Sequence, residues 1–122
     1  MGKPETMMID DVKYVREDSI KQQAEKVDGL EYAIIRTRMH GVVAGYVKSY
    51  KQGEITVLNS RRIWYFKGCQ TLEEMAVYGT TDIENCNITP VAPKTTIVED
   101  FSIIYASEKC RKQIEGAKEW KC

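Results

Sequence analysis

Three segments with the pattern of β-strands follow one another with only tight turns between them, and this feature constrains the fold most. They are residues 32–38 (YAIIRTR), 42–50 (VVAGYVKSY) and 54–68 (EITVLNSRRIWYFKG). Gly41 and Gly53 lie in the connections, where glycine accepts a positive φ without steric cost. Strands joined by such short turns pair with their neighbours, so the sequence predicts an antiparallel meander.

The meander carries two signs of strong bending. Gly45 interrupts the second strand, and glycine inside a strand is typical of a bulge or a bend. Asn59-Ser60 break the alternation of the third strand, and a bulge there re-aims the residues that follow. Residues 95–98 and 101–106 are β-branched and apolar, and we expect them to close the sheet on either side of a bend at Glu99-Asp100. The predicted fold is α+β, with a small, strongly bent antiparallel β-barrel of the SH3-like or Sm-like kind.

Capping signals predict three helices around this sheet. An N-terminal helix over 19–28 begins with a capping box at Ser19 and ends at Gly29. A short helical insertion begins at Thr71 and stops at Gly79, and a C-terminal helix begins at Ser107. The apolar stripe predicted for this last helix is Cys110, Ile114, Ala117 and Trp120.

The chain length and the N-terminus limit the class of protein. With 122 residues, we expect a flexible N-terminal extension over 1–18 and a single domain over 19–122. No apolar run is long enough to span a bilayer, and the N-terminus lacks the apolar core of a secretory signal. We therefore expect no membrane contact, a cytoplasmic location and reduced thiols.

The charge is zero overall but unevenly placed. Residues 30–68 carry seven basic and two acidic side chains, a net of +5, which leaves −5 for the rest of the chain. The basic residues are Arg36, Arg38, Lys48, Lys51, Arg61, Arg62 and Lys67. A basic block in a neutral protein is typical of a local anion site, but charges also protect solvated sheet edges. The sequence leaves both interpretations open.

The stretch from Arg61 to Phe66 concentrates two guanidiniums and three aromatic rings. This composition suits a ligand with a phosphate and a flat base, because arginine binds phosphate bidentately and an exposed ring stacks on a base. Neighbouring strand residues point to opposite faces, so Arg61 separates from Arg62, and Trp64 from Tyr65. One set is expected in the core, and we expect Trp64 to face a site or an interface.

Each of these residues also has a structural interpretation. The alternative to phosphate binding is that one of the arginines forms an ion pair with Glu73 or Glu74. Tyr46 and Tyr50, from the second strand, are candidates for the same exposed surface as Trp64. The single histidine, His40, is expected in a turn, and the sequence identifies no carboxylate that would orient it as a general base. The predicted ligand-binding residues are Arg36, Arg38, His40, Tyr46, Asn59, Arg61, Arg62, Trp64 and Tyr65.

The sequence carries no motif for catalysis or for a metal. It has no glycine-rich phosphate loop, no nucleophile elbow and no HExxH. The four cysteines, at 69, 86, 110 and 122, form no CxxC pair, and this spacing is poor for zinc. We expect no enzymatic activity, no metal and no cofactor.

Three segments within residues 34–110 together resemble a family of small uncharacterised proteins of tailed bacteriophages. They are IIRTRMHGVVAGYV, LNSRRIWYFKGCQTLEEMAVYGT and IVEDFSIIYASEKC. The central segment is the specific part, and it fits the family pattern at Leu58, Asn59, Arg61, Arg62, Trp64, Tyr65, Gly68, Leu72, Ala76 and Gly79. The chain departs from the pattern at Phe66, where the family has Trp, and at Met39-His40, where it has Ser-Ala. The resemblance implies a phage origin and the host's bacterial cytoplasm, and it brings no function.

Three functions are compatible with these residues. The first is a non-enzymatic protein that sequesters a nucleotide-type ligand, such as a cyclic nucleotide signal of host antiviral defence, or a short RNA. The second is a protein-interaction or virion accessory module, in which the Arg/aromatic segment is a subunit interface. The third is a small nucleotide-acting enzyme, with His40 as the residue to test. We expect a homo-oligomer under the first two.

Overall fold

The computed structural model describes residues 6–9, 12–15, 24 and 26–120, and in these residues the fold is α+β. The strands are β1 (Thr6–Ile9), β2 (Val12–Val15), β3 (Glu31–Thr37), β4 (Val42–Lys51), β5 (Glu54–Tyr65), β6 (Asn87–Ile88), β7 (Ala92–Ile97) and β8 (Phe101–Tyr105). The helices are α1 (Leu72–Tyr78) and α2 (Glu108–Gly116), with a short 3-10 helix, η2 (Ile83–Asn85), between them. Within these residues, no helix is long and apolar enough to cross a membrane.

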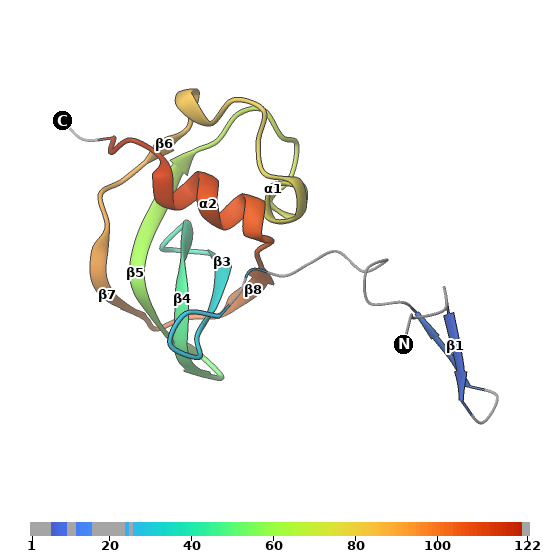
Figure 1. The fold of residues 1–122 in the computed structure, drawn as a ribbon. Coiled ribbons are helices and arrows are strands. Elements are labelled where there is room, and N and C mark those ends of the chain that lie inside the picture. Colours follow the sequence, from blue (N-terminus) through green and yellow to red (C-terminus); the bar gives the residue numbers. More distant parts are fainter. Residues whose placement is uncertain (1–5, 10–11, 16–23, 25, 121–122) are drawn as a thin grey trace.

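The predicted meander forms the centre of a six-stranded antiparallel sheet (Figure 1). β3, β4 and β5 pair in sequence order, which confirms that prediction. β8 adds to the outer edge of β3, while β6 and β7 both pair with the outer edge of β5. Among the described strands no ladder joins β7 to β8, so the sheet is not closed and the structure does not show the expected barrel. The connection from β7 to β8 carries the chain across from β5 to β3 without pairing the two strands.

The bulges lie where the sequence indicated them. The register of β4 against β5 shifts between Ala44 and Tyr46, around Gly45. A Cβ atom at Gly45 would lie 2.6 Å from a methyl carbon of Val57 and 2.8 Å from a carbonyl oxygen, so only glycine fits there without a shift. Asn59 has a φ of 49°, a left-handed conformation that asparagine tolerates better than most residues. These two irregularities bend the long strand β5.

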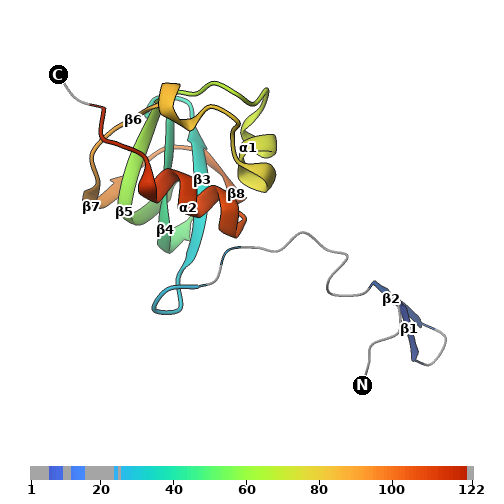
Figure 2. The same ribbon diagram turned by 45° about the horizontal axis from the view of Figure 1, so that its top comes forward.

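Both faces of the sheet are buried. The helices α1 and α2 cover one face, as Figure 2 shows. The cluster on this face includes Tyr32, Ile34, Ala44, Tyr46, Ile63, Met75 and Ile114. The opposite face buries a second cluster, formed by Ala33, Ile35, Val43, Ile55, Val57 and Ile97. Because no helix takes part in the second cluster, the curvature of the sheet brings the strands themselves over it.

Two predicted helices are confirmed, and one of them is shorter than expected. Thr71 caps α1 by accepting the N–H of Glu74 at 3.0 Å, and the carboxylate of Glu74 accepts the N–H of Gln70 at 2.8 Å. Ser107 caps α2 by accepting the N–H of Cys110 at 3.2 Å. The prediction that the apolar stripe of α2 continues to Trp120 is wrong, because α2 ends at Gly116, a poor helix former.

The predicted N-terminal helix over 19–28 falls largely on residues 19–23 and 25, which lie outside the described residues. At its end, Val27 and Leu30 form an isolated β-bridge around a turn at Asp28 and Gly29, with φ values of 54° and 78°. Gly29 therefore has its expected positive φ, but in a turn and not at a helix end. Within the predicted extension over 1–18, β1 and β2 pair as a separate two-stranded sheet.

Candidate functional site

The two adjacent arginines of β5 lie on opposite faces of the sheet, and Arg61 is the buried one. Its side chain is 3% exposed, on the face that α2 covers. Its Nη1 lies 2.6 Å from the carbonyl oxygen of Ile114 and 2.8 Å from that of Ala117. Its Nε donates to the carbonyl oxygen of Thr89 at 2.7 Å, and its Nη2 lies 3.4 Å from that of Ile88. Arg61 thus ties the C-terminal end of α2 to the chain around β6.

This arrangement explains why Arg61 serves the fold. The last carbonyls of a helix have no partner within the helix and carry partial negative charge, which a cation there stabilises. The acceptors of Arg61 are main-chain carbonyls, so the ion pair with Glu73 or Glu74 is not formed. Because these carbonyls engage all three nitrogens of a buried guanidinium, a ligand phosphate has no access to it.

The other arginine, Arg62, belongs to an exposed aromatic surface. The central carbon of its guanidinium lies 5.6 Å from the centre of the Trp64 ring. Trp64 is 60% exposed, and it stacks on Trp120 with ring centres 6.1 Å apart and planes inclined by 21°. Tyr65, the next residue of β5, is also exposed. We call these four residues, Arg62, Trp64, Tyr65 and Trp120, the Trp64 surface.

A hollow of about 330 Å³ adjoins the Trp64 surface. It forms because β5 runs further than its neighbour: Val43 and Arg62 are the last pair of the ladder between β4 and β5 at this end. Beyond that pair, the end of β5 and the start of β4 border an open space. The lining residues are Gly41, Val42, Arg62, Ile63, Trp64, Tyr65 and Phe66. The aromatic side chains and one guanidinium therefore meet beside a concave, largely apolar surface.

Three more predicted residues gather at the same end of the sheet without lining the hollow. Arg36 pairs with Val42, which does line it, and both Arg36 and Arg38 are exposed. His40 precedes Gly41 in the turn between β3 and β4, and its Nδ1 lies 2.8 Å from a carboxylate oxygen of Glu99. Two exposed cations and a histidine thus lie at the same end of the sheet as the Trp64 surface.

Glu99 is the carboxylate that sequence reasoning did not find for His40. It accepts the N–H groups of Arg38 at 2.9 Å, Met39 at 2.8 Å and His40 at 3.0 Å. The hydrogen bond from the His40 side chain, followed by that from the Met39 N–H, lowers the pKa of Glu99 to about 2. The two residues are 59 positions apart, so no local pattern links the turn after β3 to the bend after β7.

Two predicted ligand residues have structural roles instead. Tyr46 is buried, packs edge-on against Tyr32 at 4.9 Å, and donates its hydroxyl to Glu115 at 2.6 Å. Burial, and then the hydrogen bond to Glu115, raise its pKa. Asn59 is exposed, but its left-handed backbone marks it as the bulge residue of β5. Neither residue lines the hollow beside Trp64.

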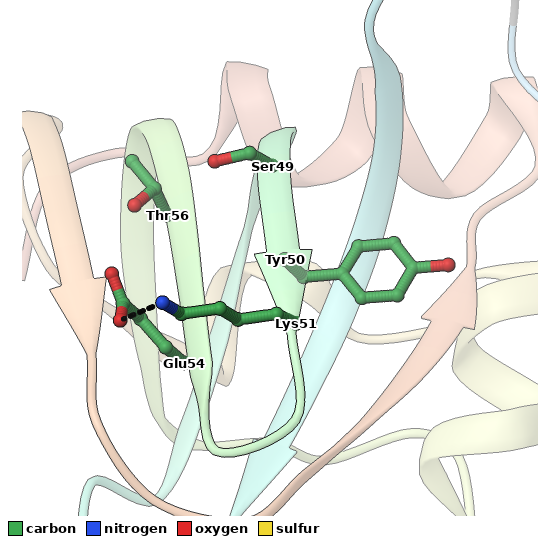
Figure 3. A pocket seen from close by; sticks show the side chains of 5 residues that line it. All are labelled: Ser49, Tyr50, Lys51, Glu54 and Thr56. Atoms are coloured by element: carbon green, nitrogen blue, oxygen red, sulfur yellow. Dashed lines mark ion pairs between the residues drawn. The ribbon is translucent and has the colours of Figure 1, made fainter.

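Tyr50 lies at the opposite end of β4 from the Trp64 surface, so its expected place beside Trp64 is wrong. It borders a second hollow, of about 260 Å³, whose other lining residues are Ser49, Lys51, Glu54 and Thr56 (Figure 3). Lys51 and Glu54 form an ion pair at 3.7 Å there, and the ring of Tyr50 points away from both. The charges of this pair cancel. We therefore expect this hollow to attract an anionic ligand less strongly than the Trp64 surface does.

The described cysteines do not form a metal site. Cys86 and Cys110 are buried and Cys69 is partly buried, and all three are free thiols. Burial raises the pKa of Cys110 to about 12, so this thiol stays protonated. In the part of the chain that the structure describes, no three His, Cys, Asp or Glu side chains come together as metal ligands would.

The fold and the site define a class of protein: a small α+β protein with an open, bent antiparallel sheet and an exposed arginine–tryptophan surface at one end. The chain belongs to the DUF6948 family, a domain of unknown function, whose model matches residues 30–114. That match spans the meander and α2 as far as Ile114, and it leaves Trp120 outside. We found no match among curated proteins and none among solved structures.

Proposed function

We propose that this protein is a non-enzymatic binding protein that sequesters a nucleotide-type ligand on the Trp64 surface. One observation carries the proposal: a tryptophan that is 60% exposed stands on a strand of the central sheet with a guanidinium 5.6 Å from its ring. A large aromatic side chain held in water loses the stabilisation that burial gives. Stacking on a base recovers that stabilisation, while the neighbouring Arg62 binds a phosphate.

The charges around the surface support an anionic ligand. Arg36, Arg38 and Lys67 are exposed at the end of the sheet where the hollow lies. With Arg61 occupied by the helix, the phosphate contacts fall to Arg62 and to these flanking cations. The Lys51–Glu54 pair at the other end of the sheet leaves that end without a comparable excess of charge.

We also propose the biological setting that the resemblance implies. In that setting the protein is encoded by a bacteriophage and acts in the host cytoplasm. A cyclic nucleotide that signals antiviral defence is the ligand that such a protein would remove to greatest effect. Removal by binding needs tight affinity and no catalytic residue, which fits a chain without a catalytic motif.

A thermal-shift panel tests this function. The panel holds cyclic di- and trinucleotides, cyclic ADP-ribose isomers, mononucleotides and a short RNA. A ligand that binds only the folded state raises the melting temperature, and we expect this for one of them. The rise disappears in the double variant Arg62→Ala/Trp64→Ala and persists in the control Tyr50→Ala/Lys51→Ala, which alters the second hollow. A flat panel with the unaltered protein contradicts the proposal.

The second candidate function is a protein-interaction module, and β8 favours it, because among the described strands it is an edge strand with β3 as its one neighbour. This strand, Phe101–Tyr105, pairs with β3 on one side, carries no charge or proline, and ends in the exposed Tyr105. Such an edge readily pairs with another chain, and Trp, Tyr and Arg are the residues that dominate interfaces. We propose a homo-oligomer under both functions. Light scattering distinguishes them, because Arg62→Ala/Trp64→Ala dissociates the oligomer if the Trp64 surface is an interface.

The pair His40–Glu99 is the observation that favours the third candidate, a nucleotide-acting enzyme. A carboxylate at 2.8 Å from Nδ1 orients an imidazole as a general base requires. The same carboxylate also joins two turns, so the pair has a structural task without any catalysis. An enzyme would consume its bound nucleotide on incubation, and His40→Ala would stop the loss. A sequestering protein returns the nucleotide unchanged.

A further inference from the structure

The C-terminal tail, residues 117–120, is tied to the sheet at both of its ends. At Ala117 the chain leaves α2 with an extended backbone, and Arg61 holds the carbonyl oxygen of Ala117 at 2.8 Å. At Trp120 the main-chain N–H donates to the carbonyl oxygen of Ile88 at 2.8 Å. In Figure 1 the tail, in red, runs from the end of α2 past β6. The tail therefore brings a second tryptophan to the end of β5.

The rings of Trp64 and Trp120 are stacked on one another. Their ring centres are 6.1 Å apart and their planes differ by 21°. A flat ring inserted between two others needs about 7 Å between the outer pair, twice the usual separation of carbon atoms in contact. The 6.1 Å between the ring centres is the distance of an ordinary offset-stacked pair, so the two rings are in contact in this structure. An outward movement of Trp120 would separate the rings and admit an aromatic base between them.

The surroundings of the tail leave room for such a movement. Beside it lies a hollow of about 360 Å³, lined by Ile83, Glu84, Gly116, Ala117 and Lys118. A Cβ atom at Gly116 would have no neighbour within 4 Å, whereas Ala117, the first residue of the tail, packs against the cluster on the α2 face. Arg61 fixes the chain up to Ala117, so a swing of residues 118–120 would pivot there and would break the hydrogen bond from the Trp120 N–H to Ile88.

We propose that Trp120 is the second wall of an aromatic clamp, which closes with Trp64 on the flat base of the ligand. This inference rests on the proposed function and extends it to the ligand class: a nucleotide with its base between two indoles and its phosphate on Arg62. Arg61 is a positioning residue in this scheme, because it sets the point from which the tail swings. In the clamp, both faces of the base are in contact with an indole ring, whereas a single exposed ring can contact only one face.

The chain offers a specific probe, because its only two tryptophans are the two walls of the clamp. Tryptophan fluorescence, excited where the seven tyrosines do not absorb, therefore reports on the clamp alone. The experiment titrates the full chain with adenosine, adenosine monophosphate and cyclic di-adenosine monophosphate. We expect at least one phosphate-bearing probe to quench the emission. Trp120→Ala is expected to weaken binding of that probe by about tenfold to hundredfold, the usual effect of removing one stacking ring. Trp120→Phe keeps a ring at this position and is expected to bind within about threefold of the unaltered protein.

The outcomes separate the clamp from the proposed function. If none of the probes binds the unaltered protein, and the thermal-shift panel is also flat, both ideas fall. If a probe binds and Arg62→Ala/Trp64→Ala abolishes binding, but Trp120→Ala binds equally well or more tightly, only the clamp is overturned. In that case the tail either does not contact the ligand or competes with it for the ring of Trp64. A melting temperature for each variant shows that the fold is intact in every comparison.

Discussion

Nη1 of Arg61 lies 2.6 Å from the carbonyl oxygen of Ile114, so a side chain of the sheet closes the end of the helix that covers it. The next residue, Arg62, points to the other face and lies beside Trp64. Two identical side chains, adjacent in the sequence, thus have separate tasks. One fixes the position of α2, and the other is available to a ligand.

Substitution of the two arginines is expected to have very unequal effects on stability. Arg61→Ala leaves several buried carbonyls without a donor and is expected to lower the free energy of unfolding by roughly 3 kcal/mol or more. Arg62→Ala is expected to change it by less than about 0.5 kcal/mol, because its side chain is partly exposed. Urea unfolding followed by circular dichroism measures both. Equal destabilisation by the two variants contradicts this division of roles.

Local features of the fold could be predicted from the sequence, and long-range ones could not. The turns at Gly41 and Gly53, and the cap at Thr71, depend on residues within a few positions, and the structure contains them. The alternation along β5 also separated Arg61 from Arg62. Which of the two is buried depends on Ile114, 53 positions away, and no pattern in β5 contains that information.

The same limit applies to the candidate site. The sequence predicts that Trp64 faces a site or an interface, and in the structure its side chain is exposed. Its partner Trp120 belongs to the predicted helix stripe, because it follows Cys110 and Ala117 at helical spacings, but α2 ends at Gly116. Glu99 and His40 meet only because the bend after β7 approaches the turn after β3. Each of these contacts joins elements that the sequence does not place relative to one another.

The Glu99 carboxylate is expected to make stability depend on acid pH. Its pKa is lowered to about 2 in the folded state, mainly by the His40 side chain and then the Met39 N–H, against about 4.3 in an unfolded chain. The unfolded state therefore binds the proton first as the pH falls. The stabilisation is complete above about pH 5 and is lost progressively down to about pH 2.

Glu99→Gln is accordingly expected to lower stability at neutral pH and to flatten its decline in acid. Urea unfolding at a series of pH values between about 2 and 7 tests this, since it covers the window in which the proton binds. The control is Asp100→Asn, which removes the same charge from the neighbouring exposed residue. If the two variants give the same pH profile, the hydrogen bonds to the turn after β3 do not stabilise the carboxylate.

Two buried tyrosines under α2 are expected to respond differently to loss of the hydroxyl group. The hydroxyl of Tyr32 is buried and has no hydrogen-bond partner among the described residues, while that of Tyr46 donates to Glu115 at 2.6 Å. Tyr32→Phe removes an unsatisfied polar atom and is expected to leave stability unchanged or to raise it by up to about 1 kcal/mol. Tyr46→Phe removes a hydrogen bond to a carboxylate and is expected to cost about 1–2 kcal/mol. A larger loss for Tyr32→Phe in thermal unfolding would show that its hydroxyl is satisfied in solution, for instance by a buried water molecule.

The bend of β4 gives the last prediction, because Gly45 has no room for a side chain. Its Cβ atom would lie 2.6 Å from Cγ1 of Val57 and 2.8 Å from the carbonyl oxygen of Leu58. Gly45→Ala therefore forces the bulge to open and is expected to destabilise the fold by about 1–3 kcal/mol, the range for overpacking a tight site. Gly116→Ala is the matched control, since a Cβ there meets no atom within 4 Å and alanine favours the helix by up to about 1 kcal/mol. Chemical denaturation of the two variants side by side should give changes of opposite sign, and a neutral Gly45→Ala would mean that the bulge adapts without cost.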